Sequence, residues 1–174
     1  MLNDWPRTVA DSTSTNSMQY EGAIAHEIGT ARELIEAVGS RIDGWVACVG
    51  TGSTFVGVAR GLRAACPHVV MAPVEPSGCE VLAGKPITKR KHLLQGTGYG
   101  FVPPHWDPRL VSLCLAVTDE EALAWKRRLA GEEGLHVGFS VAANVCAAMK
   151  PLSTDAIPSN GTVATVLCDS GIKY

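Results

Sequence analysis

The sequence predicts an α/β protein with three layers, in which a mostly parallel sheet lies between two layers of helices. Two observations favour this fold class. Continuous apolar runs have the length and composition of strands covered on both faces, and helical patterns alternate with them along the chain. A length of 174 residues is typical of one large domain or two small ones. The predicted strands are residues 45–49, 69–74, 110–117 and 162–168.

The N-terminal segment, residues 1–40, is predicted to be helical and to pack on the rest of the chain. A polar stretch at 11–16 is typical of a loop. Apolar residues with helical spacing follow at 18–28. Gly29 is expected to interrupt this helix, and Thr30 begins a Thr-x-x-Glu capping-box pattern that predicts the start of a second helix.

Residues 41–174 are predicted to form the second unit, which contains the sheet. Its first two strands are joined by a glycine-rich turn and a helix. Residues 77–109 then show little periodicity and many glycines and prolines, and a loop of that length in a compact domain tends to be functional. Thr118 is expected to cap the next helix, and Ser140 to open the last one.

Composition and charge narrow the class of function. Fifteen Lys and Arg residues against 17 Asp and Glu give a net charge of −2, which argues against binding to nucleic acid or an anionic membrane. No apolar run approaches the ~20 residues of a membrane helix. The first six residues lack the pattern of a signal peptide, so we expect a cytoplasmic protein. Six dispersed cysteines and five dispersed histidines predict reduced thiols and no metal site.

The strongest local signal is a run of small and hydroxyl residues between the first strand and its helix. Backbone N–H groups at such a turn converge on an anion, and the positive end of the helix assists them. The run therefore predicts a phosphate cradle. No lysine follows, so it is not a P-loop, and Phe55 stands where a dinucleotide fingerprint has its third glycine. Glu75, near the end of the next strand, keeps a nicotinamide-cofactor alternative open. The cradle residues are Gly50, Thr51, Gly52, Ser53 and Thr54.

Four further motifs follow in order along the chain. They are 74–76 (Val-Glu-Pro), 95–103 with Gly96, Thr97 and Gly98, 132–140 ending at Ser140, and 169–174 (Asp-Ser-Gly-Ile-Lys-Tyr). With the cradle, they resemble the C-terminal half of the cysteine synthase family. These are the fold type II pyridoxal-phosphate enzymes related to cystathionine β-synthase and the tryptophan synthase β-chain. The resemblance runs from about residue 16 to residue 174.

The resemblance implies the second lobe of a tryptophan synthase β-like fold, with pyridoxal 5'-phosphate as cofactor. It implies that residues 50–54 and 96–98 hold the cofactor and that Ser140 faces its pyridine nitrogen. Two departures stand out: Ser53 replaces a usual glycine, and residues 141–143 (Val-Ala-Ala) lack the family's glycine.

The family's Schiff-base lysine lies in an N-terminal lobe that has no counterpart among these residues, and no lysine here matches its motif. We therefore expect no catalytic residue in this chain and a hetero-oligomer in which a second chain carries the lysine lobe. The implied activity is β-replacement or β-elimination on a small amino acid. Two alternatives stay open: a non-catalytic partner or regulatory domain of a complete enzyme, and a nicotinamide-dependent Rossmann protein that uses Gly50, Gly52 and Glu75.

Overall fold

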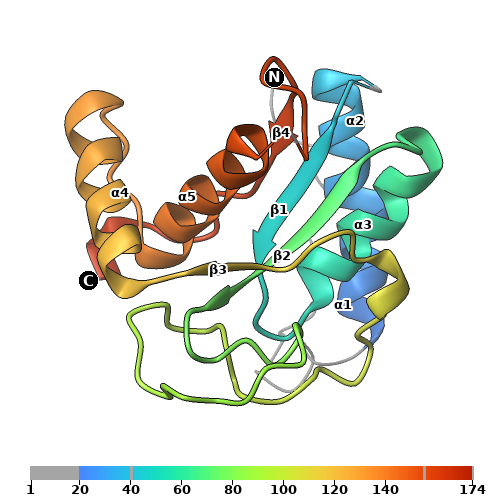
Figure 1. Ribbon diagram of the computed structural model, residues 1–174. Coiled ribbons are helices and arrows are strands. Elements are labelled where there is room, and N and C mark those ends of the chain that lie inside the picture. The colour runs from blue at the N-terminus through green and yellow to red at the C-terminus, as the bar shows by residue number, and fades with distance from the viewer. Residues whose placement is uncertain (1–19, 40, 155, 174) are drawn as a thin grey trace.

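The computed structural model describes residues 20–39, 41–154 and 156–173, so the loop expected at 11–16 lies outside the described residues. A four-stranded sheet forms the centre of the molecule, and its strand order is β3-β2-β1-β4 (Figure 1). All three strand pairs are parallel. The α/β class and the mostly parallel sheet are confirmed. The strands are β1 Gly44–Cys48, β2 Val70–Pro76, β3 Leu115–Val117 and β4 Val163–Ala164.

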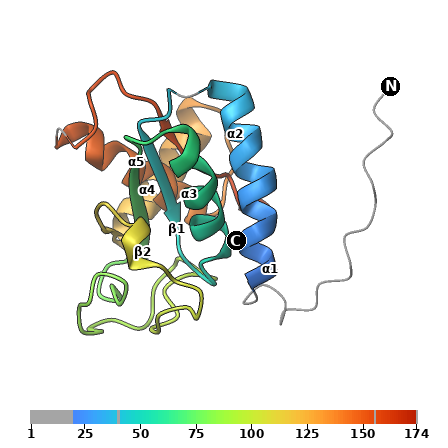
Figure 2. The same cartoon turned by 90° about the vertical axis from the view of Figure 1, so that its right-hand side faces the viewer.

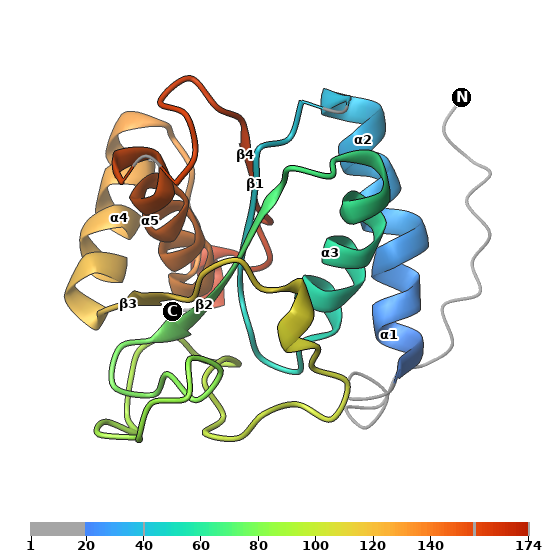
Figure 3. The same cartoon turned by 45° about the vertical axis from the view of Figure 1, so that its right-hand side comes forward.

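Helices cover both faces of the sheet and complete the three predicted layers. Figure 3 shows α1, α2 and α3 on one face and α4 and α5 on the other. Each pair of layers encloses its own core, because the side chains of β1 alternate between the two faces. Trp45 points to the α3 side and Val46 to the α5 side. The helices are α1 Tyr20–Ala25, α2 Ala31–Val38, α3 Ser53–Ala65, α4 Asp119–Glu132 and α5 Phe139–Ser153.

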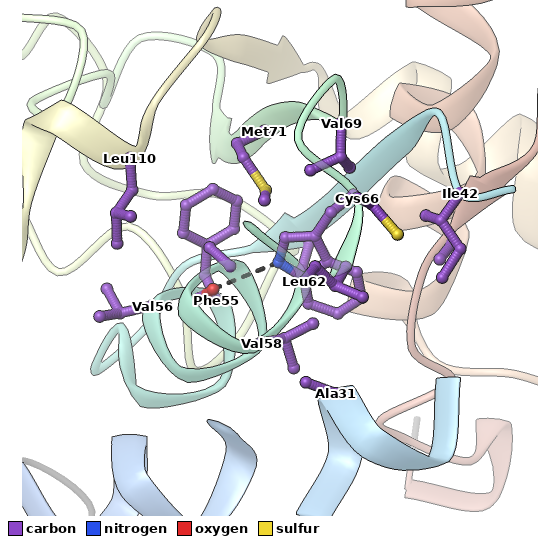
Figure 4. Packing of buried hydrophobic residues seen from close by; sticks show 14 of the residues in the cluster. Ala31, Ile42, Phe55, Val56, Val58, Leu62, Cys66, Val69, Met71 and Leu110 are labelled. Atoms are coloured by element: carbon purple, nitrogen blue, oxygen red, sulfur yellow. Dashed lines mark hydrogen bonds between the residues drawn. The ribbon is translucent and has the colours of Figure 1, made fainter. Parts of the chain in front are cut away.

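The core between the sheet and α3 holds the start of α3 firmly against β1. Figure 4 shows Phe55 and Leu62 among the buried side chains of this cluster. The indole N–H of Trp45 donates to the carbonyl oxygen of Phe55 at 3.2 Å, which satisfies a buried donor inside the apolar core. The first turn of α3, which follows the glycine-rich loop, is therefore anchored by both packing and a hydrogen bond.

The N-terminal helices differ from the prediction. A five-residue π-helical turn, His26–Thr30, joins α1 to α2, and Figure 2 shows them as one continuous rod. The N–H of Ala31 donates to the carbonyl of His26, five residues earlier. Thr30 has helical dihedral angles and makes no side-chain cap. The break expected at Gly29 and the capping box expected at Thr30 are therefore wrong, because a widened turn continues the helix past the glycine.

Two predicted strands are shorter than their apolar runs. Residues 108–110 form a 3₁₀ turn (Pro108–Leu110), and β3 begins only at Leu115. Between them, the side chain of Ser112 accepts from the N–H of Met71, where a strand would offer a backbone carbonyl. At the other edge, β4 ends at Ala164, and the amide of Asn144 bonds to the carbonyl of Val166 instead of a neighbouring strand. At both edges of the sheet, a side chain therefore takes the place of part of the backbone hydrogen-bond ladder.

Of the two remaining predictions about helix starts, one is confirmed and one is wrong. Thr118 caps α4 in a complete capping box with Glu121, as expected. Ser140 does not cap α5, because the N-cap is Gly138 and the helix begins at Phe139. Among the described residues, no helix combines the length and the apolar character needed to cross a membrane.

Candidate functional site

A pocket of about 280 Å³ lies at the carboxyl end of β1, where ligands bind in open α/β sheets. Four segments meet around it: the loop after β1, the loop around residue 96, the first turn of α5, and residues 168–169. Figure 1 shows the loop after β1 and the long loop 77–107 at the same end of the sheet. The pocket is lined by Cys48, Gly50, Thr51, Gly52, Thr54, Phe55, Gln95, Gly96, Thr97, Tyr99, Ser140, Cys168 and Asp169.

The backbone of the loop after β1 passes so close to the backbone of Gly96 that only glycine fits at position 50. A Cβ atom at Gly50 would lie 2.1 Å from the carbonyl oxygen of Gly96, so no side chain fits there. Gly52 has φ +87° and serves as the N-cap of α3, a left-handed conformation that glycine adopts at little cost. The N–H groups of the first turn that follows have no acceptor within the helix. This turn is therefore built to receive an acceptor from outside, such as an anion.

The hydroxyl groups of the loop have different surroundings. Thr51 and Thr54 line the pocket. The Thr54 hydroxyl lies 3.0 Å from Nε2 of His26, and the Ser53 hydroxyl lies 3.4 Å from Nε2 of His105. Ser53 is buried and is not among the lining residues, so its hydroxyl points behind the loop rather than into the pocket. Of the five predicted cradle residues, four therefore line the pocket.

The glycine-rich loop at 96–98 contributes to the pocket in part. Gly96 and Thr97 line it. The Thr97 hydroxyl donates to the carbonyl of Leu94 at 2.8 Å, which stabilises the turn. Gly98 lies at a small neighbouring cavity instead, and its N–H donates to the carbonyl of Val49 at 3.2 Å. That bond joins the loop to the end of β1.

Ser140 lines the pocket from the first turn of α5. Ser140 is buried, and its Oγ lies 3.4 Å from the carbonyl oxygen of Gln95. This distance is longer than an ordinary O–H···O hydrogen bond. The hydroxyl is therefore held in the pocket wall by a weak contact that a better acceptor can replace.

The predicted site missed several lining residues. Cys48 is the last residue of β1 and lies two residues before the cradle, and this proximity in the sequence could have signalled a role. Burial, together with Cys168 and Asp169, raises the pKa of the Cys48 thiol well above its usual range. Desolvation, with help from the Asp169 carboxylate, raises the pKa of Cys168 to about 11. Both thiols are thus protonated at neutral pH and unsuited to act as nucleophiles.

Asp169 fixes the start of α5. Its Oδ1 accepts from the N–H of Val141 at 3.1 Å, and a Cβ at Gly138 would overlap its carboxylate. A carboxylate at a helix N-terminus is favourable because of the helix dipole. Since Val141 follows Ser140, this bond sets where the serine lies in the pocket.

Asn144 is a polar residue near the pocket that no sequence pattern singled out. It is fully buried in α5, its Oδ1 accepts from the N–H of Cys48 at 2.7 Å, and its Nδ2 donates to the carbonyl of Val166 at 2.9 Å. A single amide therefore ties together the end of β1, helix α5 and the segment that leads to Asp169. These are the elements that surround the pocket.

Glu75 does not occupy the position that the nicotinamide alternative requires. Its carboxylate is buried and accepts from the N–H groups of Leu82 and Ala83 at 3.0 to 3.3 Å. Burial raises the pKa of Glu75. The residue lines the small neighbouring cavity rather than the pocket, so its role here is to anchor the loop after β2.

The described lysines lie elsewhere in the structure. None of the residues that line the pocket is a lysine. Lys150 donates to the carbonyl of Ala116, Lys85 pairs with Glu80, and Lys89 pairs with Asp119.

The chain is similar to several cysteine synthases. Cysteine synthase A of Escherichia coli is 37% identical over 155 residues, which make up 86% of this chain and 48% of that protein. A cysteine synthase of Staphylococcus aureus is 34% identical over 150 residues, 86% of this chain and 47% of the relative. The chain thus spans about half the length of the curated relatives it matches.

Solved structures show the same relation. The O-acetylserine dependent cystathionine β-synthase of Helicobacter pylori superposes with a TM-score of 0.79 at 30% identity, covering 91% of this chain and 50% of that one. O-ureido-L-serine synthase also gives 0.79, at 32% identity over 88% and 48% of the two chains. The family of pyridoxal-phosphate dependent enzymes matches residues 7–169, so this chain belongs to that family.

Proposed function

We propose that this chain forms the phosphate-binding half of a pyridoxal-phosphate enzyme that catalyses β-replacement or β-elimination on a small amino acid. One observation carries the proposal: a single pocket joins an anion cradle at the start of α3 to a buried serine hydroxyl at the start of α5. The relatives are cysteine synthases, and one structural neighbour is a cystathionine β-synthase that depends on O-acetylserine, while another synthesises O-ureido-L-serine. We therefore infer an O-substituted serine as substrate.

The cradle fits the phosphate end of the cofactor. A Cβ at Gly50 would lie 2.1 Å from the carbonyl oxygen of Gly96, so the loop packs closely only because residue 50 is glycine, and Gly52 and Thr54 at the start of α3 line the pocket. The positive end of α3 favours a dianion there. Thr51 and Thr54 supply hydroxyl donors at the same place.

Ser140 fits the ring end. The bound cofactor supplies an electron sink for the substrate's α-carbon. A serine hydroxyl opposite the ring nitrogen offers a hydrogen bond without a charge, unlike a carboxylate, and so does not stabilise a proton on that nitrogen. This arrangement suits β-elimination better than transamination. Asp169 and Asn144 keep the serine in place through the backbone of α5 and the end of β1.

The lysine that links to the cofactor comes, in this proposal, from polypeptide outside these 174 residues, carried by a second chain. The lysine-free pocket lining supports this view. Apolar side chains beside the pocket support it further: Tyr99 stacks on Phe101 with ring centroids 5.8 Å apart, and both are 45% exposed, next to the exposed Val102. Exposed apolar groups of this kind mark interaction surfaces. A cytoplasmic location stays a prediction.

Borohydride trapping and turnover test the proposal together. The protein is purified with whatever remains bound to it, incubated with pyridoxal 5'-phosphate, reduced with borohydride and mapped by mass spectrometry. A cofactor adduct on a lysine outside residues 1–174, with turnover of O-acetylserine and sulfide, is the expected result. An adduct on a lysine of this chain would contradict the proposed division of the site. Cofactor retention without turnover would favour the non-catalytic alternative.

A further inference from the structure

His26 lies directly behind the phosphate cradle, between two threonine hydroxyls. Its Nε2 is 3.0 Å from Oγ1 of Thr54, and its Nδ1 is 2.9 Å from Oγ1 of Thr30. Thr54 lines the pocket, whereas Thr30 belongs to the π-helical turn. The three side chains therefore form a chain of hydrogen bonds that leads from the N-terminal helices into the pocket.

Two features of the fold are responsible for this contact. The π-helical turn brings His26 and Thr30 within hydrogen-bond distance of one another, and such turns are frequent at functional sites. On α3, Gly57 lies on the same face as Thr54, three residues later. A Cβ at Gly57 would lie 2.1 Å from the carbonyl of Ala23 and 2.7 Å from Cβ of His26. The glycine thus permits the close approach that lets the imidazole contact Thr54.

The hydrogen bonds restrict how protons are arranged. Burial lowers the pKa of His26, so its ring is neutral at pH 7 and carries one N–H. If Nδ1 carries the proton, Nε2 accepts the Thr54 hydrogen, and Thr54 cannot donate into the pocket. If Nε2 carries it, Nε2 donates to Thr54, and the Thr54 hydrogen is available to a ligand. In that state Thr30 donates to Nδ1.

We propose that His26 is a positioning residue that directs the Thr54 hydroxyl toward a bound phosphate, through the tautomer protonated at Nε2. A phosphate dianion only accepts hydrogen bonds, so its presence selects the arrangement in which Thr54 donates. Thr30, His26 and Thr54 then act in sequence, each donating to the next acceptor, and the last donates to the phosphate. This inference rests on the proposed function, since it requires a phosphate group in the cradle.

The first measurement is the tautomer itself. Histidine-¹⁵N-labelled protein is titrated with inorganic phosphate and with pyridoxal 5'-phosphate, and the His26 signals are assigned by comparison with His26→Gln. We expect a neutral ring protonated at Nε2 in the complex. A ring protonated at Nδ1, alone or on both nitrogens, would overturn the proposal.

Matched variants provide the second measurement, the dissociation constant for pyridoxal 5'-phosphate. His26→Met keeps an apolar side chain of similar reach but cannot hydrogen-bond, and we expect affinity to fall by roughly three- to tenfold. His26→Gln retains a donor at a position like that of Nε2, so it should recover most of the loss. Equal affinities in the wild type, the Met variant and the Gln variant would overturn the relay. An equal loss of affinity in the Met and Gln variants would also overturn it, because that result would show that His26 acts only through its packing and not through a hydrogen bond.

The outcome for the wild-type protein separates this inference from the proposed function. If the wild type binds neither inorganic phosphate nor pyridoxal 5'-phosphate, both are contradicted. If it binds and the Met variant binds equally well, only the relay is contradicted. Thermal unfolding of each variant identifies any loss of affinity that comes from unfolding. If His26→Met does not fold, Thr54→Val replaces it in the same measurement of affinity, and Thr54→Ser, which keeps the hydroxyl, should restore binding.

Discussion

Single polar residues decide the geometry of the pocket. Asn144 is buried among small apolar residues of α5, yet both ends of its amide are bonded, to Cys48 and to Val166. Leaving a buried donor or acceptor without a partner costs about 1–3 kcal/mol, so the position tolerates no apolar substitute well. Asp169 holds the preceding turn of the same helix, at its N-terminus. Together they explain why Ser140 lies in the pocket wall rather than at a helix cap.

Ser140→Ala tests the role of that serine. We expect the fold to be retained, with a change in stability below about 1 kcal/mol, because the weak 3.4 Å contact to Gln95 is the hydrogen bond that the hydroxyl makes. The absorbance of bound pyridoxal 5'-phosphate and the turnover of O-acetylserine should both change. Ser153→Ala, near the other end of α5, is the matched control and should alter neither. An unchanged spectrum in Ser140→Ala would contradict the assignment to the ring nitrogen.

Cys48 offers a test of the pocket's electrostatics. Its raised pKa keeps the thiol protonated, and the thiolate is the form that reacts. Alkylation by iodoacetamide at pH 8 should therefore be at least about tenfold slower than that of an unperturbed cysteine in a model peptide. Peptide mass spectrometry after timed quenching measures the rate at each cysteine. Reaction at Cys48 as fast as in the peptide would contradict the burial and the neighbouring carboxylate.

At the scale of elements, α3 connects the cradle to the N-terminal helices. Gly57 and Gly61 lie on one face of α3, and a Cβ at either would collide with the π-helical turn or its neighbours. This close packing holds His26 against Thr54. The two glycines are spaced for a helix–helix contact, but the sequence alone does not say which helix they face.

Gly57→Ala should separate these helices. The added Cβ would meet a backbone carbonyl, which cannot rotate away, so we expect a loss of about 1–3 kcal/mol in unfolding free energy and weaker binding of pyridoxal 5'-phosphate. Gly131→Ala is the matched control in α4, where an added Cβ meets nothing within 4 Å. It should stabilise the protein by about 0.5–1 kcal/mol. Urea unfolding of both variants gives the comparison, and equal effects would contradict the close approach.

Thr118→Ala tests the capping of α4. The Thr118 hydroxyl accepts from the N–H of Glu121, and the Glu121 carboxylate accepts from the N–H of Thr118. Loss of the cap should cost about 1 kcal/mol in unfolding free energy. Cofactor affinity should not change, because α4 does not line the pocket. A matching loss of affinity would show that α4 is coupled to the site.

The elements predicted correctly are those whose signals are local. The buried runs that became β1 and β2, the capping box of α4 and the glycine-rich turn between β1 and α3 depend on neighbours within a few residues. The shortened β3 and β4 depend on the bonds of Ser112 to Met71 and of Asn144 to Val166, whose partners are 41 and 22 residues apart. The π-helical turn depends on packing against α3, which overrides the helix-breaking tendency of Gly29. His26 escaped notice for the same reason, because its partner Thr54 is 28 residues distant.

At the scale of the whole molecule, one end of the sheet carries the polar pocket and the exposed apolar loop around Tyr99 and Phe101. Both faces of the sheet are covered by helices, so the two cores are complete within the described residues. At the pocket end, the exposed side chains of Tyr99 and Phe101 lie beside the polar cavity. In the proposed half-site, a further segment would cover them.

In the proposed arrangement, the pocket holds pyridoxal 5'-phosphate with its phosphate on the loop at 50–54 and its ring nitrogen at Ser140. A crystal structure of the protein with the bound cofactor would reveal both positions. We predict phosphate oxygens within about 3 Å of backbone nitrogens after Gly52 and of Oγ1 of Thr54, and the Ser140 hydroxyl at the same distance from the ring nitrogen. A cofactor bound with its phosphate elsewhere, or with the Ser140 hydroxyl turned away from the ring, would contradict the account.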